Sequence, residues 1–576
     1  MGYTLTHLSE VRIFLPKTFK VTQWDTLEPW FQTLFDANPQ TPNEFRLWLQ
    51  QWNELSCVIE EDMAWRYIRM TCHTDDEVAK DAYNFYLQNI MPNQSLWNDK
   101  LQKKYAVHPH RNAITDASYR ILDRSIENAL QLFREENIPL QSEIYAKAQE
   151  FGEISGAMTV EMEGKVLTMQ QAGALLEQSD RNFRESVWRK IQGRRGKERE
   201  NLHALLDTLC NLRQQEANNA GFQTYTEYKF KVMGRYDYTI QDCLRFHEAA
   251  ETVIKPQYQH MMQVRREKLK IDALRPWDLA VDIYGDTPLR PFADGHELTQ
   301  KAIEVFRRIR PELAEMIVTM REMGHLDLDS RPGKAPGGYN HPLAESGVPF
   351  VFMNAAGTHD DLNTMMHEAG HAFHSFLTHT LELNDFKHTP SEVAELASMS
   401  MELISSSHWD VFYPDPQELK RAKIDHLSQA LTLLTWVATV DAFQHWLYAN
   451  PGHSHADREN AWTNCYYRFH GHEVDWQGLE MNLALMWQKQ MHIFEVPFYY
   501  IEYGIAQMGA LGVWMNYLED PVKGVEQYLE ALRLGYTRDI PEIYAAAGVP
   551  FDFSAERMRT LMTFGKQQLE KLESIA

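Results

Sequence analysis

The stretch "GTHDDLNTMMHEAGHAFHSFL", residues Gly357–Leu377, predicts a buried helix in the C-terminal half of the chain. Thr358 is a preferred N-cap residue, and Asp361 stands three positions later, where it can complete a capping box. Apolar side chains occupy most of the helix surface, which is typical of a helix packed inside a protein. Gly370 has no side chain, so it permits a neighbouring element to approach closely.

The same helix carries His367, Glu368 and His371 in the pattern H-E-x-x-H. Side chains four residues apart project from one face of a helix about one turn apart, so both imidazoles can reach one metal ion. Glu368 lies about 100° round the helix, toward the place of a metal-bound water. A chain with 24 histidines and 80 acidic residues contains such a pattern by chance about 0.14 times. The match alone therefore leaves a second interpretation open, in which a buried helix uses its histidines to bind backbone carbonyls.

A third metal ligand is expected in "HTPSEVAELASMSMELISSS", residues His388–Ser407. Residues 389–392 have the form of an N-cap, a first-turn proline and a capping-box glutamate. The Glu392 side chain is therefore expected to cap the start of the helix. Glu395 lies one turn further on between small alanines, which makes it the predicted ligand. Glu402 shares that face about 10 Å along the helix. We expect it to support a ligating histidine, with an ordinary salt bridge as the alternative.

An aromatic cluster follows in "MHIFEVPFYYIEYGIAQMGALGVW", residues Met491–Trp514. Hydrolysis of a peptide bond builds negative charge on the carbonyl oxygen, and hydroxyl or imidazole donors stabilise that charge. The candidate donors are His492, Tyr499, Tyr500 and Tyr503. Taken alone, the cluster is more typical of an aromatic helix in a protein core.

Most of the remaining chain has the three- and four-residue apolar spacing of helices. Residues 156–169 alternate around a Glu-Gly turn and predict a hairpin, and residues 347–355 predict a short strand. A loop rich in proline and glycine covers residues 331–349, next to the candidate site. We divide the chain into an N-terminal helical lobe, residues 1–200, and a catalytic lobe, residues 201–576.

Composition excludes several classes of protein. The 57 basic and 80 acidic residues leave a net charge of −23, which disfavours nucleic acid as a partner. No apolar run approaches the roughly 18–20 residues of a membrane span, and the first residues lack the form of a signal peptide. The five cysteines form no C-x-x-C pair, so they are expected to be reduced thiols of a cytoplasmic protein.

Together these motifs resemble the thimet oligopeptidase / oligoendopeptidase F family of zinc metallopeptidases, and the oligoendopeptidase F branch more closely. The resemblance rests on H-E-x-G-H-x-x-H, on the glutamate of "VAELAS" and on "PFYYIEYG". The segments "EANNAGFQTYTEYKF", residues 216–230, and "GKAPGGYNHP", residues 333–342, agree with that branch as well. The likeness covers most of residues 180–570.

The resemblance implies one Zn²⁺ per chain. It makes Glu368 the general base and then the proton shuttle to the leaving amine, while His374 would stand beside the metal without binding it. The implied zinc ligands are His367, His371 and Glu395. His492 and Tyr503 would contact the substrate or the developing oxyanion, with Tyr499 or Tyr500 as a further donor.

The family fold implies a mainly α protein, in which two helical lobes flank a deep substrate channel and a small β-sheet lies beside the zinc-binding helix. A peptide would lie along the edge strand, assigned to Val348–Met353, in contact with Val348 and Phe350. The expected activity is that of a zinc-dependent endopeptidase for short unstructured peptides. A zinc carboxypeptidase or dipeptidyl carboxypeptidase is the alternative. A non-catalytic peptide-binding protein is disfavoured because Glu368 is intact. Cleavage specificity and oligomeric state stay open.

Overall fold

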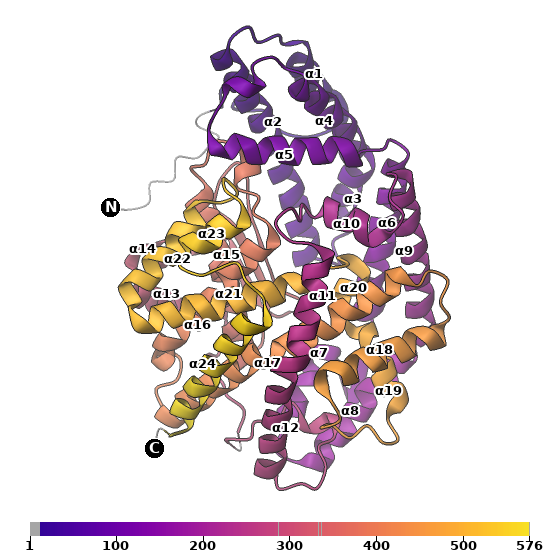
Figure 1. Ribbon diagram of the computed structural model, residues 1–576, viewed down its shortest axis with the longest axis vertical. Helices are drawn as coiled ribbons and strands as arrows, with labels where there is room; N and C mark the ends of the chain where they lie inside the picture. Colours follow the sequence, from indigo (N-terminus) through magenta and orange to yellow (C-terminus); the bar gives the residue numbers. More distant parts are fainter. Residues whose placement is uncertain (1–11, 286, 332, 336, 575–576) are drawn as a thin grey trace.

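The computed structural model describes residues 12–285, 287–331, 333–335 and 337–574, and this part of the chain is mainly helical, as predicted (Figure 1). Residues 1–11, on which the expectation about a signal peptide rests, lie outside it. In the ranges described, none of the helices combines the length and the apolar character needed to cross a bilayer.

The first helices form the upper end of the molecule in Figure 1 around an aromatic core. Phe45 stacks on Trp48 and on Tyr105, with ring centroids 5.6 Å apart in both pairs. Leu383 and Phe386, from much later in the chain, are buried in the same core. This end of the molecule is therefore packed onto the segment between the two candidate metal-binding helices. The elements of residues 12–156 are α1 (Trp24–Asp36), α2 (Pro42–Cys72), α3 (Glu77–Phe85), a π-turn (Tyr86–Ile90), α4 (Met91–Ala106), a 3₁₀ turn (Arg111–Ala113), α5 (Ala117–Leu132) and α6 (Asn137–Gly156).

The predicted hairpin follows and is confirmed. Strands β1 (Thr159–Met162) and β2 (Lys165–Thr168) pair antiparallel around the tight turn at Glu163 and Gly164, both of which have positive φ. The next elements are α7 (Met169–Ala174), η4 (Leu175–Glu177), α8 (Arg181–Gly196), α9 (Arg199–Asn219), α10 (Tyr225–Val232), α11 (Ile240–Ala249), η5 (Ala250–Ile254), α12 (Lys255–Leu269) and η6 (Pro276–Asp278).

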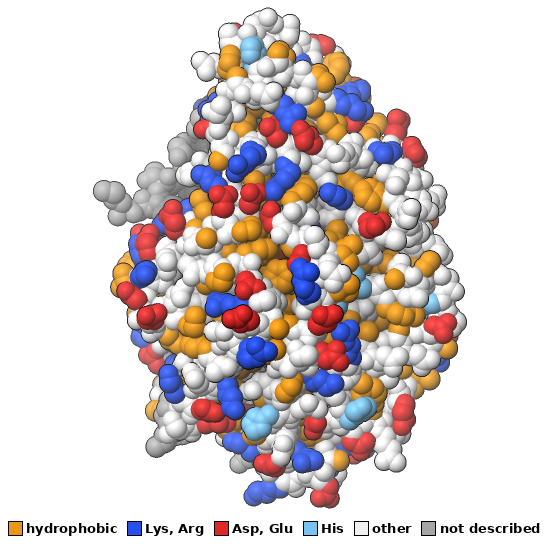
Figure 2. Space-filling model, in the orientation of Figure 1, with side chains coloured by type: hydrophobic (Ala, Val, Ile, Leu, Met, Phe, Trp, Pro, Cys, Tyr) orange, Lys and Arg blue, Asp and Glu red, His pale blue; other side chains and the backbone are white. Residues whose placement is uncertain are grey.

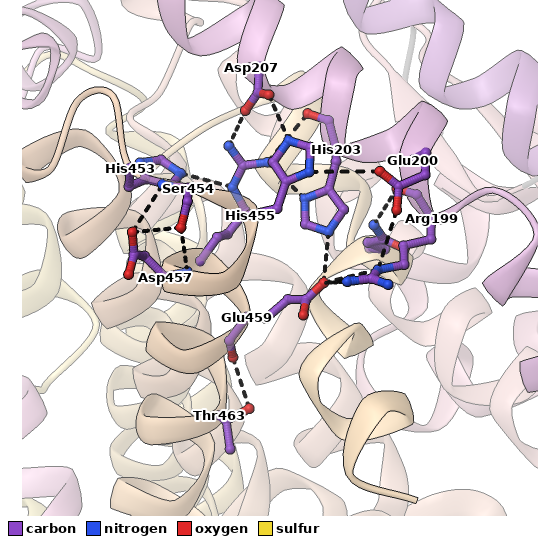
Figure 3. Close-up of polar contacts among 12 residues, drawn as sticks. Arg199, Glu200, His203, Asp207, His453, Ser454, His455, Asp457, Glu459 and Thr463 are labelled. Carbon is purple, nitrogen blue, oxygen red and sulfur yellow. Dashed lines mark hydrogen bonds and ion pairs between the residues drawn. The ribbon is translucent and has the colours of Figure 1, made fainter.

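A polar network joins α9 to α18 (His455–His470), as Figure 3 shows. His203 is fully buried, and its Nε2 lies 3.1 Å from Glu459 Oε1. Arg199 donates to the same Glu459 oxygen at 2.6 Å, and Arg458 lies 3.1 Å from His203 Nδ1. Since each of these buried charges has an opposite charge or a hydrogen-bond partner, the network fixes the two helices against each other.

The remaining elements build the largest core, in which α15, α16 and α21 pack together. They are α13 (Gly295–Ile309), α14 (Pro311–Met323), α15 (His359–Thr378), η7 (Asn384–Phe386), α16 (Ser391–Ser405), η8 (Ser406–Val411), α17 (Pro416–Ala449), α18, α19 (Glu480–Ala484), η9 (Met486–Lys489), α20 (Met491–Glu495), α21 (Tyr500–Glu519), α22 (Pro521–Arg533), α23 (Ile540–Ala546) and α24 (Ala555–Ser574).

A three-stranded sheet lies beside α15, and its order corrects one prediction. The strands are β3 (Leu326–Asp329), β4 (Tyr339–His341) and β5 (Phe350–Ala355), in the order β3-β5-β4. The strand predicted at residues 347–355 is confirmed, but β5 is central, so its assignment as the edge strand is wrong. β4, inside the predicted loop, is an outer strand.

The same order removes the expected substrate contacts of Val348 and Phe350. Both side chains are buried, and β5 has a neighbouring strand on each side. The Phe350 ring meets Trp65 of α2 edge to face, with centroids 5.9 Å apart. Phe350 thus belongs to the packing between α2 and the sheet, whereas Val348 is buried in the largest core.

The face drawn in Figure 2 carries acidic and basic side chains interspersed with apolar ones. The basic run at residues 189–200 lies on α8 and α9, where Arg189 pairs with Glu185 and Arg194 with Glu198 one turn apart. Such pairs one turn apart are typical of a solvated helix surface. All five cysteines are free.

Candidate active site

Helix α15 begins as predicted. Thr358 Oγ1 accepts the Asp361 backbone N–H at 3.2 Å, and Asp361 Oδ2 accepts the Thr358 N–H at 2.8 Å. This capping box fixes the helix start, so His367 and His371 stand near the middle of a regular helix. Their rings are 4.8 Å apart at the centroids and nearly perpendicular.

Gly370 brings the second helix close, as its missing side chain indicated. A Cβ atom at this position would lie 2.6 Å from Ser398 Cα and 2.7 Å from the Ala397 carbonyl oxygen. Both neighbours are backbone atoms of α16. The absence of a side chain at Gly370 therefore sets the separation of the two helices and delivers Glu395 to the histidines.

The predicted N-cap of α16 is wrong. Pro390 occupies the N-cap position without any side-chain cap, and the helix begins at Ser391. The Glu392 side chain is buried and accepts a hydrogen bond from the Tyr238 hydroxyl, while Tyr544 donates to its carbonyl oxygen at 2.9 Å. Glu392 is thus engaged elsewhere, as expected, although by distant tyrosines rather than by a capping box.

Three of the predicted side chains converge. Glu395 Oε2 lies 3.4 Å from His367 Nε2 and 3.8 Å from His371 Nε2. The ligand atoms of His367, His371 and Glu395 are all within 4.8 Å of one another. Two imidazole nitrogens and one carboxylate oxygen are the donor set of many zinc hydrolases, so the residues present fit this ion.

Each candidate ligand is held by a further hydrogen bond. Glu402 Oε1 lies 2.7 Å from His367 Nδ1, which leaves Nε2 of that ring facing Glu395. Tyr499 donates its hydroxyl to Glu395 Oε1 at 2.7 Å, and Ser398 donates to Oε2 at 3.1 Å. Such contacts orient metal ligands and set their basicity. The geometry agrees with the supporting place predicted for Glu402.

The electrostatics of the cluster favour a cation. Burial lowers the pKa of His367, but the hydrogen bond to Glu402 and the charge of Glu395 act more strongly and raise it to about 10. The carboxylates thus stabilise positive charge at this point, whether a proton or a metal ion carries it. Burial lowers the pKa of His371 to about 4, which leaves a neutral imidazole.

Glu368 stands beside this group with one free oxygen. The residue is 6% exposed, and its buried Oε2 has no hydrogen-bond partner in the part of the chain that the structure describes. Burial raises the pKa of Glu368 to about 7, although the charge of His367 acts in the opposite direction. On the other side, a Cβ atom at Gly338 would come within 3.9 Å of Glu368 Oε1. Glu368 therefore lies between the metal ligands and the start of β4.

His492 at the start of α20 and Tyr503 in the first turn of α21 come together. His492 Nε2 lies 3.3 Å from the Tyr503 hydroxyl, and the Gln490 amide donates to His492 Nδ1 at 3.0 Å. With Nδ1 accepting, the ring proton sits on Nε2. Burial and the nearby Glu395 carboxylate raise the pKa of Tyr503 well above its ordinary value. Both groups therefore remain hydrogen-bond donors at neutral pH.

The other predicted residues take different places. The Tyr499 hydroxyl is already donated to Glu395, so it orients that carboxylate. Tyr500 is 9% exposed and packs in the core. Its ring meets that of His492 edge to face, with the ring centroids 4.9 Å apart. His374 is buried on α15 outside the group of ligand atoms, and burial lowers its pKa to about 3.

Several residues of the site carried no sequence signal that we used. Ser398 and Gln490 are positioned by contacts that only the packing of helices creates. The strand β4 is three residues long and lies in a segment rich in proline and glycine. The alternation of Tyr339 and His341 around Asn340 was the one available hint of it.

Comparison with known proteins agrees with this arrangement. A family model described as Peptidase family M3 matches residues 174–563, and one described as Peptidase M3 N-terminal domain matches residues 14–133. Oligopeptidase PepF of Bacillus subtilis (strain 168) is 20% identical over 325 residues, 56% of this chain and 47% of the relative. Oligoendopeptidase F (chromosomal) of Lactococcus lactis subsp. cremoris is 20% identical over 356 residues, 56% of this chain and 54% of the relative. The chain thus spans about half the length of these curated relatives.

Solved structures share the fold over almost the whole chain. A structure of PZ peptidase A with an inhibitor is 24% identical, covers 96% of this chain and 99% of its own, and superposes with a TM-score of 0.91. Oligoendopeptidase-F from Enterococcus faecium is 16% identical, covers 96% and 97%, and has a TM-score of 0.62. Since the first family model alone covers more than half of the residues, the predicted relationship to oligoendopeptidase F is confirmed, and the chain belongs to peptidase family M3.

Proposed function

We propose that this protein is a zinc-dependent metalloendopeptidase that hydrolyses internal bonds of short unstructured peptides. One observation carries the proposal: His367, His371 and Glu395 converge to ligand distances while the buried Glu368 keeps an unpaired carboxylate oxygen beside them. The family match and the names of the relatives, an oligopeptidase and an oligoendopeptidase, support the same substrate class.

His367 Nε2, His371 Nε2 and a Glu395 oxygen would hold the zinc ion. When bound, the ion would lower the pKa of a water molecule and polarise a peptide carbonyl. Tyr499, Ser398 and Glu402 keep the ligands in place through the hydrogen bonds described above. Their contribution is a preformed site that does not have to reorganise during the reaction.

Glu368 is the proton carrier in this proposal. Its free Oε2 accepts a proton from the attacking water while the water oxygen bonds to the carbonyl carbon. The same carboxyl group then gives that proton to the amide nitrogen as the carbon–nitrogen bond breaks. A carboxyl group with a pKa near neutrality is suited to both steps.

Tyr503 and His492 supply donors for the negative charge that develops on the carbonyl oxygen. The two lie 3.3 Å apart, and both carry a proton at neutral pH. We assign the direct contact to Tyr503, whose pKa is raised by burial and by the charges of Glu395 and Glu368, so that it lies near the reacting groups. Preorganised donors of this kind contribute several kcal/mol to transition-state stabilisation, about 3 kcal/mol for a single donor.

The substrate backbone is proposed to pair with β4. This strand is an outer strand of the sheet, and the Asn340 backbone lies within hydrogen-bonding reach of Glu368. An extended peptide added at such an edge gains main-chain hydrogen bonds without regard to its side chains. The channel predicted from the family fold would admit such a peptide and exclude folded proteins.

An observation near the sheet favours internal cleavage over the carboxypeptidase alternative. A carboxypeptidase needs a free cation for the terminal carboxylate of its substrate. Arg331 and Lys334 lie close to β4 along the chain, but both donate to Asp327, at 2.6 and 2.9 Å. Neither of these two cations is free for that purpose.

The test replaces Glu368 and measures zinc and turnover separately. Glu368→Gln should retain the zinc ion held by His367, His371 and Glu395 and lose about 10²- to 10⁴-fold of kcat/KM, the usual contribution of a general base. The substrate is an internally quenched peptide blocked at both ends, assayed before and after chelation. Glu519→Gln, on an exposed position at the end of α21, is the matched control. Wild-type turnover in Glu368→Gln would remove this residue from the proposed step, and failure to cleave the blocked peptide would favour an exopeptidase.

A further inference from the structure

A second group of metal-ligand side chains lies in the interior between α11 and α17, with no member on α15 or α16. The Cys243 sulfur, an Asp441 carboxylate oxygen and a His445 ring nitrogen are all within 4.8 Å of one another. Cys243 and Asp441 are fully buried, and the His445 side chain is 12% exposed. The ligand atoms of His367, His371 and Glu395 lie within the same limit, and these are the two such groups in the described ranges.

The sequence places these residues in two helical pairs. "CLRFH", residues 243–247, and "DAFQH", residues 441–445, each carry two ligand-type side chains four positions apart. Such pairs project from one face of a helix, as in the H-E-x-x-H motif. Helices α11 and α17 pack together, so the two faces meet. The fourth member, His247, lies 2.8 Å through its Nε2 from Asp441 Oδ2.

The described residues do not supply hydrogen-bond partners for every polar atom of this group. Asp441 Oδ1 and His445 Nε2 are both buried and have no hydrogen-bond partner among the residues that the structure describes. His445 Nε2 is 3.4 Å from Asp441 Oδ2, without the geometry of a hydrogen bond. A buried polar atom without a partner costs free energy in the folded state, and a buried charge costs more. An ion held between these atoms would remove the cost.

The charges and the donor types indicate which metal ion this group would bind. One thiolate and one carboxylate neutralise a divalent cation, which permits a charge-balanced site in a dry interior. In the described part of the chain, Asp441 forms ion pairs with His247 and His445 alone. The neighbouring Arg235 forms an ion pair with Glu502, in which its Nη2 lies 2.9 Å from Glu502 Oε1. A set of sulfur, imidazole and carboxylate donors suits Zn²⁺ better than Mg²⁺ or Ca²⁺.

The spacing is compatible with binding after small side-chain movements. Zinc–ligand distances of about 2.0–2.3 Å place the ligand atoms roughly 3.3–3.8 Å apart around a tetrahedral ion. The pair Asp441 and His445 is already at 3.4 Å, and the widest separation in the group is at most 4.8 Å.

We propose that Cys243, Asp441 and His445 form a second, structural Zn²⁺ site, in which His247 orients the Asp441 carboxylate. The site would cross-link α11 to α17, and α17 in turn packs against α18, α21 and α24. Because the group is buried, the ion would stabilise the fold and would not contact substrate.

The first test counts metal in the full-length protein by elemental mass spectrometry after saturation with zinc and removal of excess. We expect about two zinc ions per chain in the wild type and about one in either Cys243→Ser or His371→Ala, since each variant disables a different site. The loss in His371→Ala tests the proposed catalytic ion, so failure of one proposal is distinguished from failure of the other. One ion in the wild type that persists in Cys243→Ser would overturn the second site.

The second test starts from the absorption spectrum of the cobalt-loaded wild-type protein. Cobalt bound to a thiolate gives an intense sulfur-to-metal charge-transfer band in the near ultraviolet, whereas the ligands His367, His371 and Glu395 contain no sulfur. The cobalt-loaded wild type should show this band, and Cys243→Ser should lose it. Cys465→Ser, at a partly buried thiol outside both groups, is the matched control and should keep it. A wild-type spectrum without the band, or a band that survives Cys243→Ser, would show that Cys243 binds no metal.

Discussion

Gly370→Ala tests whether the contact between α15 and α16 positions the metal ligands. The added Cβ would meet Ser398 Cα at 2.6 Å, whereas ordinary van der Waals contact begins at 3.4 Å. The colliding atoms belong to the α16 backbone and cannot turn aside as a flexible side chain could. The two helices must therefore separate by about 0.8 Å at this point.

The expected change in the stability of Gly370→Ala follows from two opposing effects. Alanine has a helix propensity about 1 kcal/mol better than glycine, which stabilises the variant. Overpacking of a tight core costs about 1–3 kcal/mol, and a contact with backbone belongs at the upper end. We expect a net destabilisation of about 2 kcal/mol. Because Ser398 is one turn from Glu395, we also expect zinc affinity to fall on the order of 10- to 100-fold, the size of losing a contact that supports a metal ligand.

The assay combines thermal unfolding of the metal-free protein with zinc affinity from competition with a chelator. Gly193→Ala is the matched control, because Gly193 is exposed on α8 and a Cβ there would have no atom within 4 Å. This control should unfold at a slightly higher temperature, with a gain of up to about 1 kcal/mol, and should bind zinc as the wild type does. If Gly370→Ala matches the wild type in both measurements, the close contact does not position Glu395 and our reasoning about the site is wrong.

Three further predictions concern the ligands and the buried polar network. Glu402→Gln should weaken zinc binding about 10- to 100-fold, measured by chelator competition, because the His367 ring loses a charged partner; unchanged affinity would contradict the role of Glu402. Glu395→Ala should abolish tight zinc binding at the site of His367 and His371, while Glu392→Ala should lower the melting temperature and keep the metal at that site, since Glu392 binds Tyr238; the reverse result would exchange the two assignments. Burial, with the charges of Arg458 and His455, lowers the pKa of His203 from 6.5 to about 4. Between these pH values the folded state therefore binds fewer protons than the unfolded state. The protein is expected to lose stability as the pH falls from about 6.5 toward 4. His203→Gln should flatten this part of the melting-temperature profile, whereas the exposed His260→Gln should keep the wild-type slope, and equal slopes in both would contradict the assignment.

Local features were predictable because they depend on neighbours a few residues apart. The capping box of Thr358 and Asp361 and the turn at Glu163 and Gly164 are both present. The four-residue spacing of His367 and His371 places both rings on one face, since a helix turns every 3.6 residues. The same periodicity places Glu402 on the face of Glu395.

The wrong predictions all concern partners that are distant in the chain. A capping box after Thr389 was reasonable on local grounds, but Tyr238 binds Glu392 across 154 residues. The order of the sheet could not be derived, because the segment of β4 has no strand pattern longer than three residues. The choice between Tyr499 and Tyr500 depended on how α21 is rotated against α16, and the packing turned Tyr499 toward Glu395.

The sequence by itself determined that the chain is mainly helical, that one buried helix carries a metal-binding pair with a carboxylate beside it, and that the chain resembles the oligoendopeptidase F branch. Only the tertiary structure decided how Glu395 reaches the histidines, which strand forms an outer edge of the sheet, and that Cys243 meets Asp441 and His445. Helical periodicity is a property of a few consecutive residues, whereas these contacts arise when helices far apart in sequence bury their apolar faces against one another.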